Sequence, residues 1–233
     1  MTRTRSRTMT DIRTERATAR RSFLARLAAG IGAGGAALVA GTPVAARVPK
    51  AFTPRRHAAD DWLDTLGTQH RFVFDTTTTA AFSDALRFAN NFLNANQSGY
   101  GLKDADSGVV IVARHFSTPY AYNDALWAKY GATLATFANP GTPVGKAPTA
   151  NPFHDATTVD VVVGALITRG AHLAVCGMAT RFLAGQIAKT TNGNAETIQA
   201  ELAANLVPNA HLMAAGILAV NRAQERGYTL ATA

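Results

Sequence analysis

Short continuous apolar runs alternate with stretches of helical spacing over residues 70–230. The runs have the length of β-strands, and the longest of them is the β-branched segment Val109–Ala113, typical of a strand buried on both faces. Strands are predicted at 70–75, 109–113, 171–176, 212–213 and 228–230, and helices at 80–96, 178–189, 195–205 and 216–226. This alternation predicts an α/β fold: a three-layer α/β/α domain over residues 69–233, with a mainly parallel sheet of about five strands.

Three further segments are less regular. Pro119 favours the start of a helix over 120–130. Residues 131–155 are rich in Gly and Pro, so we expect an inserted irregular segment, serving as a lid over a pocket or as an arm that contacts a neighbouring subunit. The valines of 157–169 favour a strand, whereas the spacing of Val162, Leu166 and Arg169 favours a helix.

Residues 47–68 are predicted to be a linker with one short helix. Asp60 is placed to cap that helix, and Trp62, Leu63 and Leu66 are placed to dock it on the domain.

Residues 1–46 have the pattern of an export signal. The paired Arg20 and Arg21 are followed by Phe23 and Leu24, then by a mildly apolar stretch and by small residues up to Ala46. This order indicates a twin-arginine signal peptide and a periplasmic location, with membrane contact only during export. Retention as a membrane anchor is the competing interpretation, but the apolar stretch is shorter than the ~20 residues that span a bilayer.

Most of the net charge of the chain lies in its first 46 residues. The net charge is +8, of which residues 1–46, with eight Lys or Arg and two Asp or Glu, carry +6. The predicted domain is therefore nearly neutral, and we exclude nucleic acid as a partner.

Cys176 is the only cysteine and ends a predicted strand immediately before a helix. Ligand sites in open α/β sheets lie at the carboxyl ends of strands, and a helix start favours thiolate over thiol. Cys176 is therefore a candidate nucleophile, with the backbone of Gly177 and Met178 beside it. The alternative is a buried cysteine that only fills the core.

Other candidates follow from the same strand-end rule. Arg114 and His115 end the second strand and should lie near Cys176, with His115 as an acid, a base or a thiolate partner, or simply a hydrogen-bonded loop residue. Asp75, at the end of the first strand, is a candidate for substrate binding. Asp124 either orients His115 or caps a helix.

Cofactor chemistry has little support in the sequence. Metal binding by the histidines is conceivable, but His115, His154, His172 and His211 have no metal-ligand spacing, and we expect no metal or other cofactor. A hydrolase using His115 lacks a nucleophile motif.

The last third of the chain resembles the DsrE/DsrF-like family of sulfur-relay proteins. The resemblance rests on the turn at residues 176–179, on Arg181, and on the motifs at 207–210, 214–216 and 225–229. It implies a helix over 157–169, a persulfide carried on Cys176, substrate binding by Arg181 and a homo-oligomer. It does not extend to residues 114–158, where this chain has a longer segment than compact family members.

Together these observations predict an exported sulfur carrier. Cys176 would take sulfur from a small donor or partner protein and pass it on. The alternative is a non-catalytic periplasmic module that binds a small ligand or assists assembly, with Cys176 as a packing residue.

Overall fold

The computed structural model describes residues 52–67, 69–141, 143, 145–154, 156–157 and 159–233. The predicted export signal, including Arg20, Arg21, Phe23 and Leu24, lies outside the described residues. Among those described, no helix is both long and apolar enough to cross a membrane.

Five parallel strands form one sheet, in the order β4-β3-β2-β1-β5. The strands are β1 (His70–Thr76), β2 (Ser107–Ala113), β3 (His172–Cys176), β4 (Ala210–Met213) and β5 (Thr229–Thr232). In β2 every residue is buried, as the apolar run predicts. The expected sheet of about five strands is confirmed.

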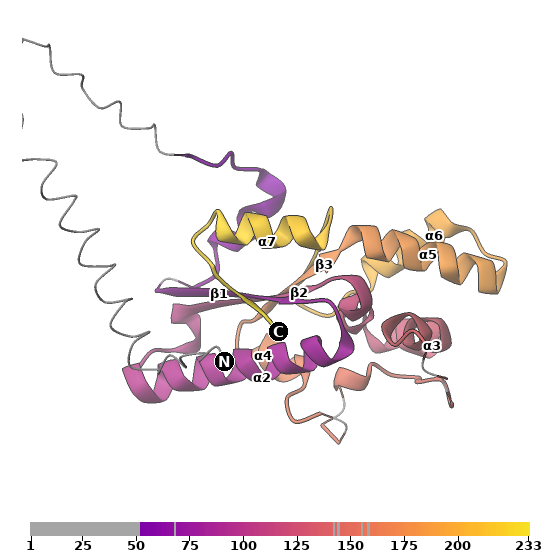
Figure 1. Cartoon of the computed structure of the whole chain (residues 1–233), viewed down its shortest axis with the longest axis horizontal. Coiled ribbons are helices and arrows are strands. Elements are labelled where there is room, and N and C mark those ends of the chain that lie inside the picture. Colours follow the sequence, from indigo (N-terminus) through magenta and orange to yellow (C-terminus); the bar gives the residue numbers. More distant parts are fainter. Residues whose placement is uncertain (1–51, 68, 142, 144, 155, 158) are drawn as a thin grey trace, which may run out of the picture. The chain divides into compact units, whose positions relative to one another are not determined.

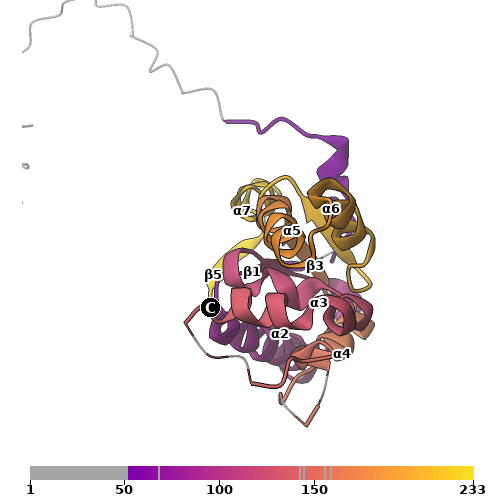
Figure 2. The same ribbon diagram turned by 90° about the vertical axis from the view of Figure 1, so that its right-hand side faces the viewer.

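Helices cover both faces of the sheet (Figure 1). One face carries α7 (Gly216–Gln224) and the 3-10 helix η1 (Ala58–Asp64), and the other carries α2 (Thr79–Tyr100) and α4 (Val163–Thr168). The remaining helices, α3, α5 and α6, lie together toward one end of the sheet (Figures 1 and 2). Their bounds are Asp124–Ala138, Gly177–Thr191 and Ala195–Ala204. The three-layer α/β/α fold is confirmed.

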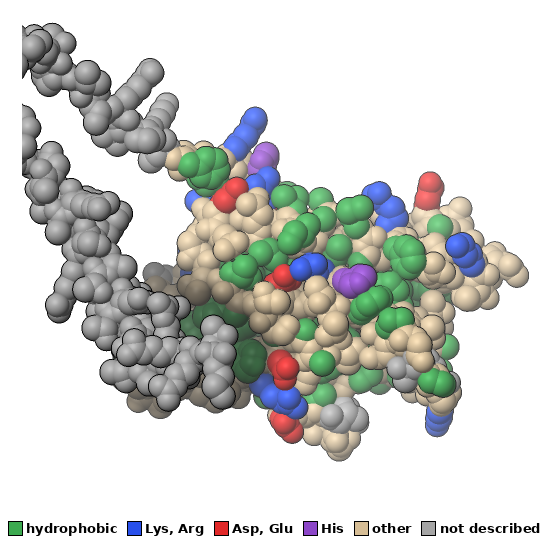
Figure 3. All heavy atoms as spheres, viewed as in Figure 1, with side chains coloured by type: hydrophobic (Ala, Val, Ile, Leu, Met, Phe, Trp, Pro, Cys, Tyr) green, Lys and Arg blue, Asp and Glu red, His purple; other side chains and the backbone are tan. Residues whose placement is uncertain are grey.

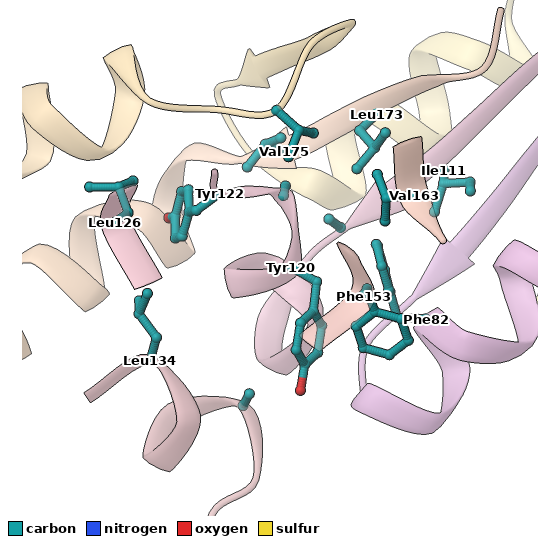
Figure 4. Packing of buried hydrophobic residues seen from close by; sticks show 14 of the residues in the cluster. Phe82, Ile111, Tyr120, Tyr122, Leu126, Leu134, Phe153, Val163, Leu173 and Val175 are labelled. Carbon is teal, nitrogen blue, oxygen red and sulfur yellow. The ribbon is translucent and has the colours of Figure 1, made fainter. Parts of the chain in front are cut away.

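Alternate residues of β3 serve the two faces. Ala174 packs with Val110 and Val112 under α7, whereas Leu173 and Val175 belong to the larger core on the α2 side. In that larger core Phe82, Tyr120 and Phe153 lie against one another (Figure 4), with Phe82 and Phe153 ring centroids 5.0 Å apart. Cys176 shares its strand face with Ala174, because side chains alternate along a strand.

Three short 3-10 helices complete the connections. They are η2 (Asp104–Asp106), η3 (His115–Ala121) and η4 (Pro152–His154). Thr78 caps α2 through a hydrogen bond to the Ala81 N–H, as its hydroxyl allows.

Four local predictions need correction. Pro119 lies inside η3, and α3 instead starts at Asp124 under the side-chain cap of Asn123. Residues 131–138 continue α3 and are not irregular. Within 157–169 only Val163–Thr168 is helical. Asp60 lies within η1, whose N-cap is His57, and its carboxylate pairs with Arg222.

Candidate functional site

Cys176 is both the last residue of β3 and the N-cap of α5. Its backbone is extended (φ −74°, ψ 108°), and the Ala179 N–H donates a hydrogen bond to Sγ over 3.4 Å. The first N–H groups of a helix have no partners inside the helix, so the thiol occupies a place where an anion is stabilised. The predicted strand–turn–helix placement of Cys176 is confirmed.

Gly177 allows α5 to begin directly beside the end of β4. A Cβ atom at this position would lie 2.6 Å from the Met213 carbonyl oxygen, which is closer than real side chains approach a backbone atom. The glycine is therefore required by packing. It fixes the distance between the cysteine turn and the neighbouring strand.

A buried hydrogen-bond chain holds the turn from beneath. Thr180 Oγ1 donates to the Cys176 carbonyl over 3.0 Å, and Tyr122 Oη donates to Thr180 Oγ1 over 2.9 Å. Burial raises the pKa of Tyr122 well above its ordinary value, and the nearby Cys176 raises it further. Tyr122 therefore stays protonated and remains a donor at every physiological pH.

Arg114 and Asp75 form a two-pronged ion pair between the ends of β2 and β1. Arg114 Nε and Nη2 each donate to one carboxylate oxygen over 2.7 Å. The hydrogen bond to Asp75 raises the pKa of Arg114, and the Cys176 thiol adds a smaller contribution in the same direction. Asp75 thus positions Arg114, and most of the guanidinium charge is compensated before any ligand binds.

Gly216, the first residue of α7, packs directly on Arg114. A Cβ atom there would lie 2.4 Å from the Cβ of Arg114. The absence of a side chain at Gly216 lets the arginine reach across the strand ends. The start of α7 is therefore part of the site, although its sequence motif alone does not reveal this.

His115 lies at the rim of the site with an exposed side chain. Its backbone has φ 54°, a left-handed conformation that few non-glycine residues adopt, and its ring lies tilted against that of Phe116 with centroids 3.8 Å apart. Among the described residues it has no side-chain hydrogen bond. The structure therefore brings His115 near Cys176 without a partner that orients it.

A cavity of about 590 Å³ opens over Cys176. Arg114, His115, Cys176 and Met178 line it, so four sequence-predicted candidates meet at one place. Figure 3 shows hydrophobic side chains gathered around a histidine on the face where α3, α5 and α7 approach one another. The cysteine itself is 8% exposed, so a ligand must enter the cavity to reach its sulfur.

Two candidates lie elsewhere. Arg181 is exposed on α5 and is not among the residues that line the cavity. Asp124 does not orient His115, because its Oδ1 accepts from the Asn151 N–H over 2.8 Å and lies 2.9 Å from His154 Nδ1.

Aromatic and aliphatic walls of the cavity were missed by the sequence analysis. Phe116, Phe137, Phe182 and Ile217 are the main ones. Phe182 lies on the helix expected over 178–189, where Leu183 and Ile187 are buried, but it is itself 56% exposed. The helical phase set by Leu183 and Ile187 already turns Phe182 by about one hundred degrees away from the core, and this signal could have placed it.

The other histidines form no metal site with these residues. His172 and His211 lie toward the amino ends of β3 and β4, with Nδ1 and Nε2 2.8 Å apart. Trp62 stacks on His211 with ring centroids 3.9 Å apart. Burial lowers the pKa of His172, and burial with the neighbouring His172 lowers that of His211 to about 4. In the part of the chain that the structure describes, no three His, Cys, Asp or Glu residues could share a metal ion.

Comparison of the chain with protein-family models, with curated proteins and with solved structures gives no match. The site offers one thiol at a helix start, a compensated guanidinium and a mostly apolar cavity. That set is suited to the attack of a thiolate on a soft atom such as sulfur.

Proposed function

We propose that this protein is a sulfur carrier that holds a persulfide on Cys176. The observation that carries the proposal is the position of Sγ. It lies at the start of the 15-residue helix α5, accepts the Ala179 N–H, and faces a cavity large enough for a small donor.

The transfer is a pair of thiol exchanges. The Cys176 thiolate attacks the outer sulfur of a donor persulfide R–S–SH, a new S–S bond forms, and the donor's own S–S bond breaks. R–S⁻ leaves with the electron pair, and Cys176 becomes Cys–S–SH. An acceptor thiolate then attacks the outer sulfur and releases the Cys176 thiolate, so no external oxidant or reductant is consumed.

The chain's residues support each step. The Ala179 N–H and the positive end of α5 stabilise negative charge on the cysteine sulfur. Arg114, held by Asp75, keeps one nitrogen, Nη1, without a hydrogen bond to the described residues, and it can face the departing thiolate. The absence of a second cysteine means that no internal disulfide can discharge the persulfide.

The experiment is direct because the chain has one thiol. The protein is incubated with inorganic polysulfide, freed of excess reagent and analysed by intact mass. We expect a gain of one sulfur atom that disappears on reduction and is absent from Cys176→Ser. An unmodified wild-type mass would reject the proposal.

The low exposure of Cys176 favours a second candidate, a ligand-binding module in which the cysteine only packs. The two candidate functions predict different reactivity of Cys176 in the folded protein. A carrier should react with iodoacetamide while folded, whereas a packing cysteine should react only after denaturation. Arg181→Met serves as a folded control, since Arg181 does not line the cavity and its loss should leave the labelling rate unchanged.

Export by the twin-arginine route completes the proposal. It rests on Arg20, Arg21, Phe23 and Leu24, and it places the carrier in the periplasm. Assembly as a homo-oligomer is proposed from the family resemblance alone. Replacement of both arginines by lysine should retain the protein in the cytoplasm, which fractionation would show.

A further inference from the structure

A second cavity adjoins the one above Cys176. It has a volume of about 500 Å³ and lies between α3 and α5, and it shares Phe137 and Phe182 with the first cavity. The ring centroids of Phe137 and Phe182 are 5.9 Å apart, and those of Phe116 and Phe137 are 5.7 Å apart. Three phenylalanines thus mark a groove that leads away from the cysteine, and α3 and α5 lie side by side in Figures 1 and 2.

The described lining of the groove carries few charged side chains. Arg114 is the only Lys, Arg, Asp or Glu among the residues lining the two cavities, and Asp75 already binds it. The hydroxyls of Thr136 and Thr190, in the second cavity, donate to the Ala132 and Ile187 carbonyls of their own helices. Among its described residues, the second cavity therefore offers no charged side chain to an anionic ligand. An uncharged apolar chain would find matching walls.

The walls are also unusually exposed for large apolar side chains. Met178 is 63%, Phe182 56% and Ile217 60% exposed, and all three line the cavity over Cys176. Contiguous exposed apolar surface in a globular domain marks a binding site. Each cavity has the volume of a small-molecule site, and the pair together forms a hollow instead of a flat face.

We propose that the ligand is a linear alkyl thiol or alkyl persulfide, with its sulfur at Cys176 and its chain lying along Phe116, Phe137 and Phe182 into the second cavity. This inference rests on the proposed sulfur transfer and names its substrate class. In the exchange described above, R is then the alkyl chain, and R–S⁻ is the alkyl thiolate that leaves.

The test measures binding without sulfur exchange. The full chain is loaded with the neutral fluorophore N-phenyl-1-naphthylamine, which is displaced with butyl, octyl and dodecyl methyl sulfides. These thioethers carry no transferable sulfur. We expect affinity to rise roughly two- to fourfold per added methylene until the groove is filled.

A matched pair of variants locates the site. Thr136→Glu places a carboxylate in the second cavity and should weaken dodecyl binding at least ~10-fold while leaving butyl binding nearly unchanged. Ala128→Glu adds the same charge to the exposed surface of α3 outside both cavities and should behave as wild type. Equal affinity for the three alkyl sulfides, or wild-type affinity of Thr136→Glu for the dodecyl sulfide, would overturn the inference.

The outcomes separate this inference from the sulfur-carrier proposal. A chain-length series without a polysulfide adduct would keep the groove as an apolar-ligand site and reject sulfur transfer. A polysulfide adduct without a rise of affinity with chain length would reject the alkyl-binding groove and leave the sulfur-carrier proposal standing. Analytical sedimentation over the same protein concentrations tests whether a second copy of the chain fills the groove instead. If binding of the fluorophore falls as the protein self-associates, the second copy covers the groove and the alkyl ligand is rejected.

Discussion

The two ends of β3 differ sharply although the strand is only five residues long. At the carboxyl end, Cys176 faces an open cavity with exposed apolar walls. At the amino end, the rings of His172, His211 and Trp62 stack on one another. The carboxyl end leaves large apolar side chains exposed, whereas aromatic rings stack on one another at the amino end. The apolar cavity and the aromatic stack thus lie at opposite ends of one strand.

Removing Arg114 should have the largest effect on stability at the open end. Arg114→Met leaves the carboxylate of Asp75, whose side chain is 8% exposed, without a cationic partner. We expect a loss of about 3–5 kcal/mol in the free energy of unfolding, measured by urea denaturation. Arg181→Met, at an exposed site on α5, should change it by less than ~0.5 kcal/mol. Equal losses would show that the ion pair has no special role.

Aromatic truncations at the two ends should separate packing from function. Trp62→Ala removes the ring that covers His211 and should cost about 2–3 kcal/mol. Phe182→Ala, which removes a largely exposed ring, should cost less than ~0.5 kcal/mol. Thermal melts of both variants would measure the contrast. A larger loss for Phe182→Ala would reverse the assignment of the two ends.

Acid should weaken the aromatic stack at the amino end of β3. Burial and the neighbouring His172 lower the pKa of His211 from its ordinary 6.5 to about 4 in the folded chain, so the unfolded chain binds more protons between these values. The free energy of unfolding should therefore fall as pH falls from about 6.5 to about 4, by roughly 1–2 kcal/mol for two half-buried rings screened by solvent. The double variant His172→Gln with His211→Gln should lose this part of the pH dependence. Its persistence would assign the effect to other groups.

The smallest effect should come from the chain of hydrogen bonds under Cys176. Tyr122→Phe removes the donor to Thr180 and should cost about 1 kcal/mol. Thr180 can still donate to the Cys176 carbonyl, so iodoacetamide labelling of the native protein should keep its rate within about twofold. A large change in labelling would show that Tyr122 controls the cysteine itself.

The sequence predicts the strand ends well because the rules involved are local. The apolar run before Cys176, the following glycine and the helical pattern specify the strand–turn–helix unit without knowledge of distant contacts. In a parallel sheet the carboxyl ends share one edge, so Arg114 and Asp75 could be grouped with Cys176 before the structure was known.

The walls of the site could not be predicted in the same way. Phe137 lies in a segment expected to be irregular, and its approach to Phe182 depends on how α3 packs against α5. The contact of Gly216 with Arg114 and the stack of Trp62 on His211 join residues far apart in sequence. Such contacts follow from tertiary packing, which periodicity does not encode.

The lengths of the strands have a consequence for the molecule in concentrated solution. The outer strands β4 and β5 have four residues each, whereas the inner strands β1 and β2 have seven. An edge strand with unpaired backbone groups can template the addition of a foreign strand, and a short edge offers few such groups. The apolar inner strands, which would aggregate readily if exposed, are thereby shielded from intermolecular sheet extension.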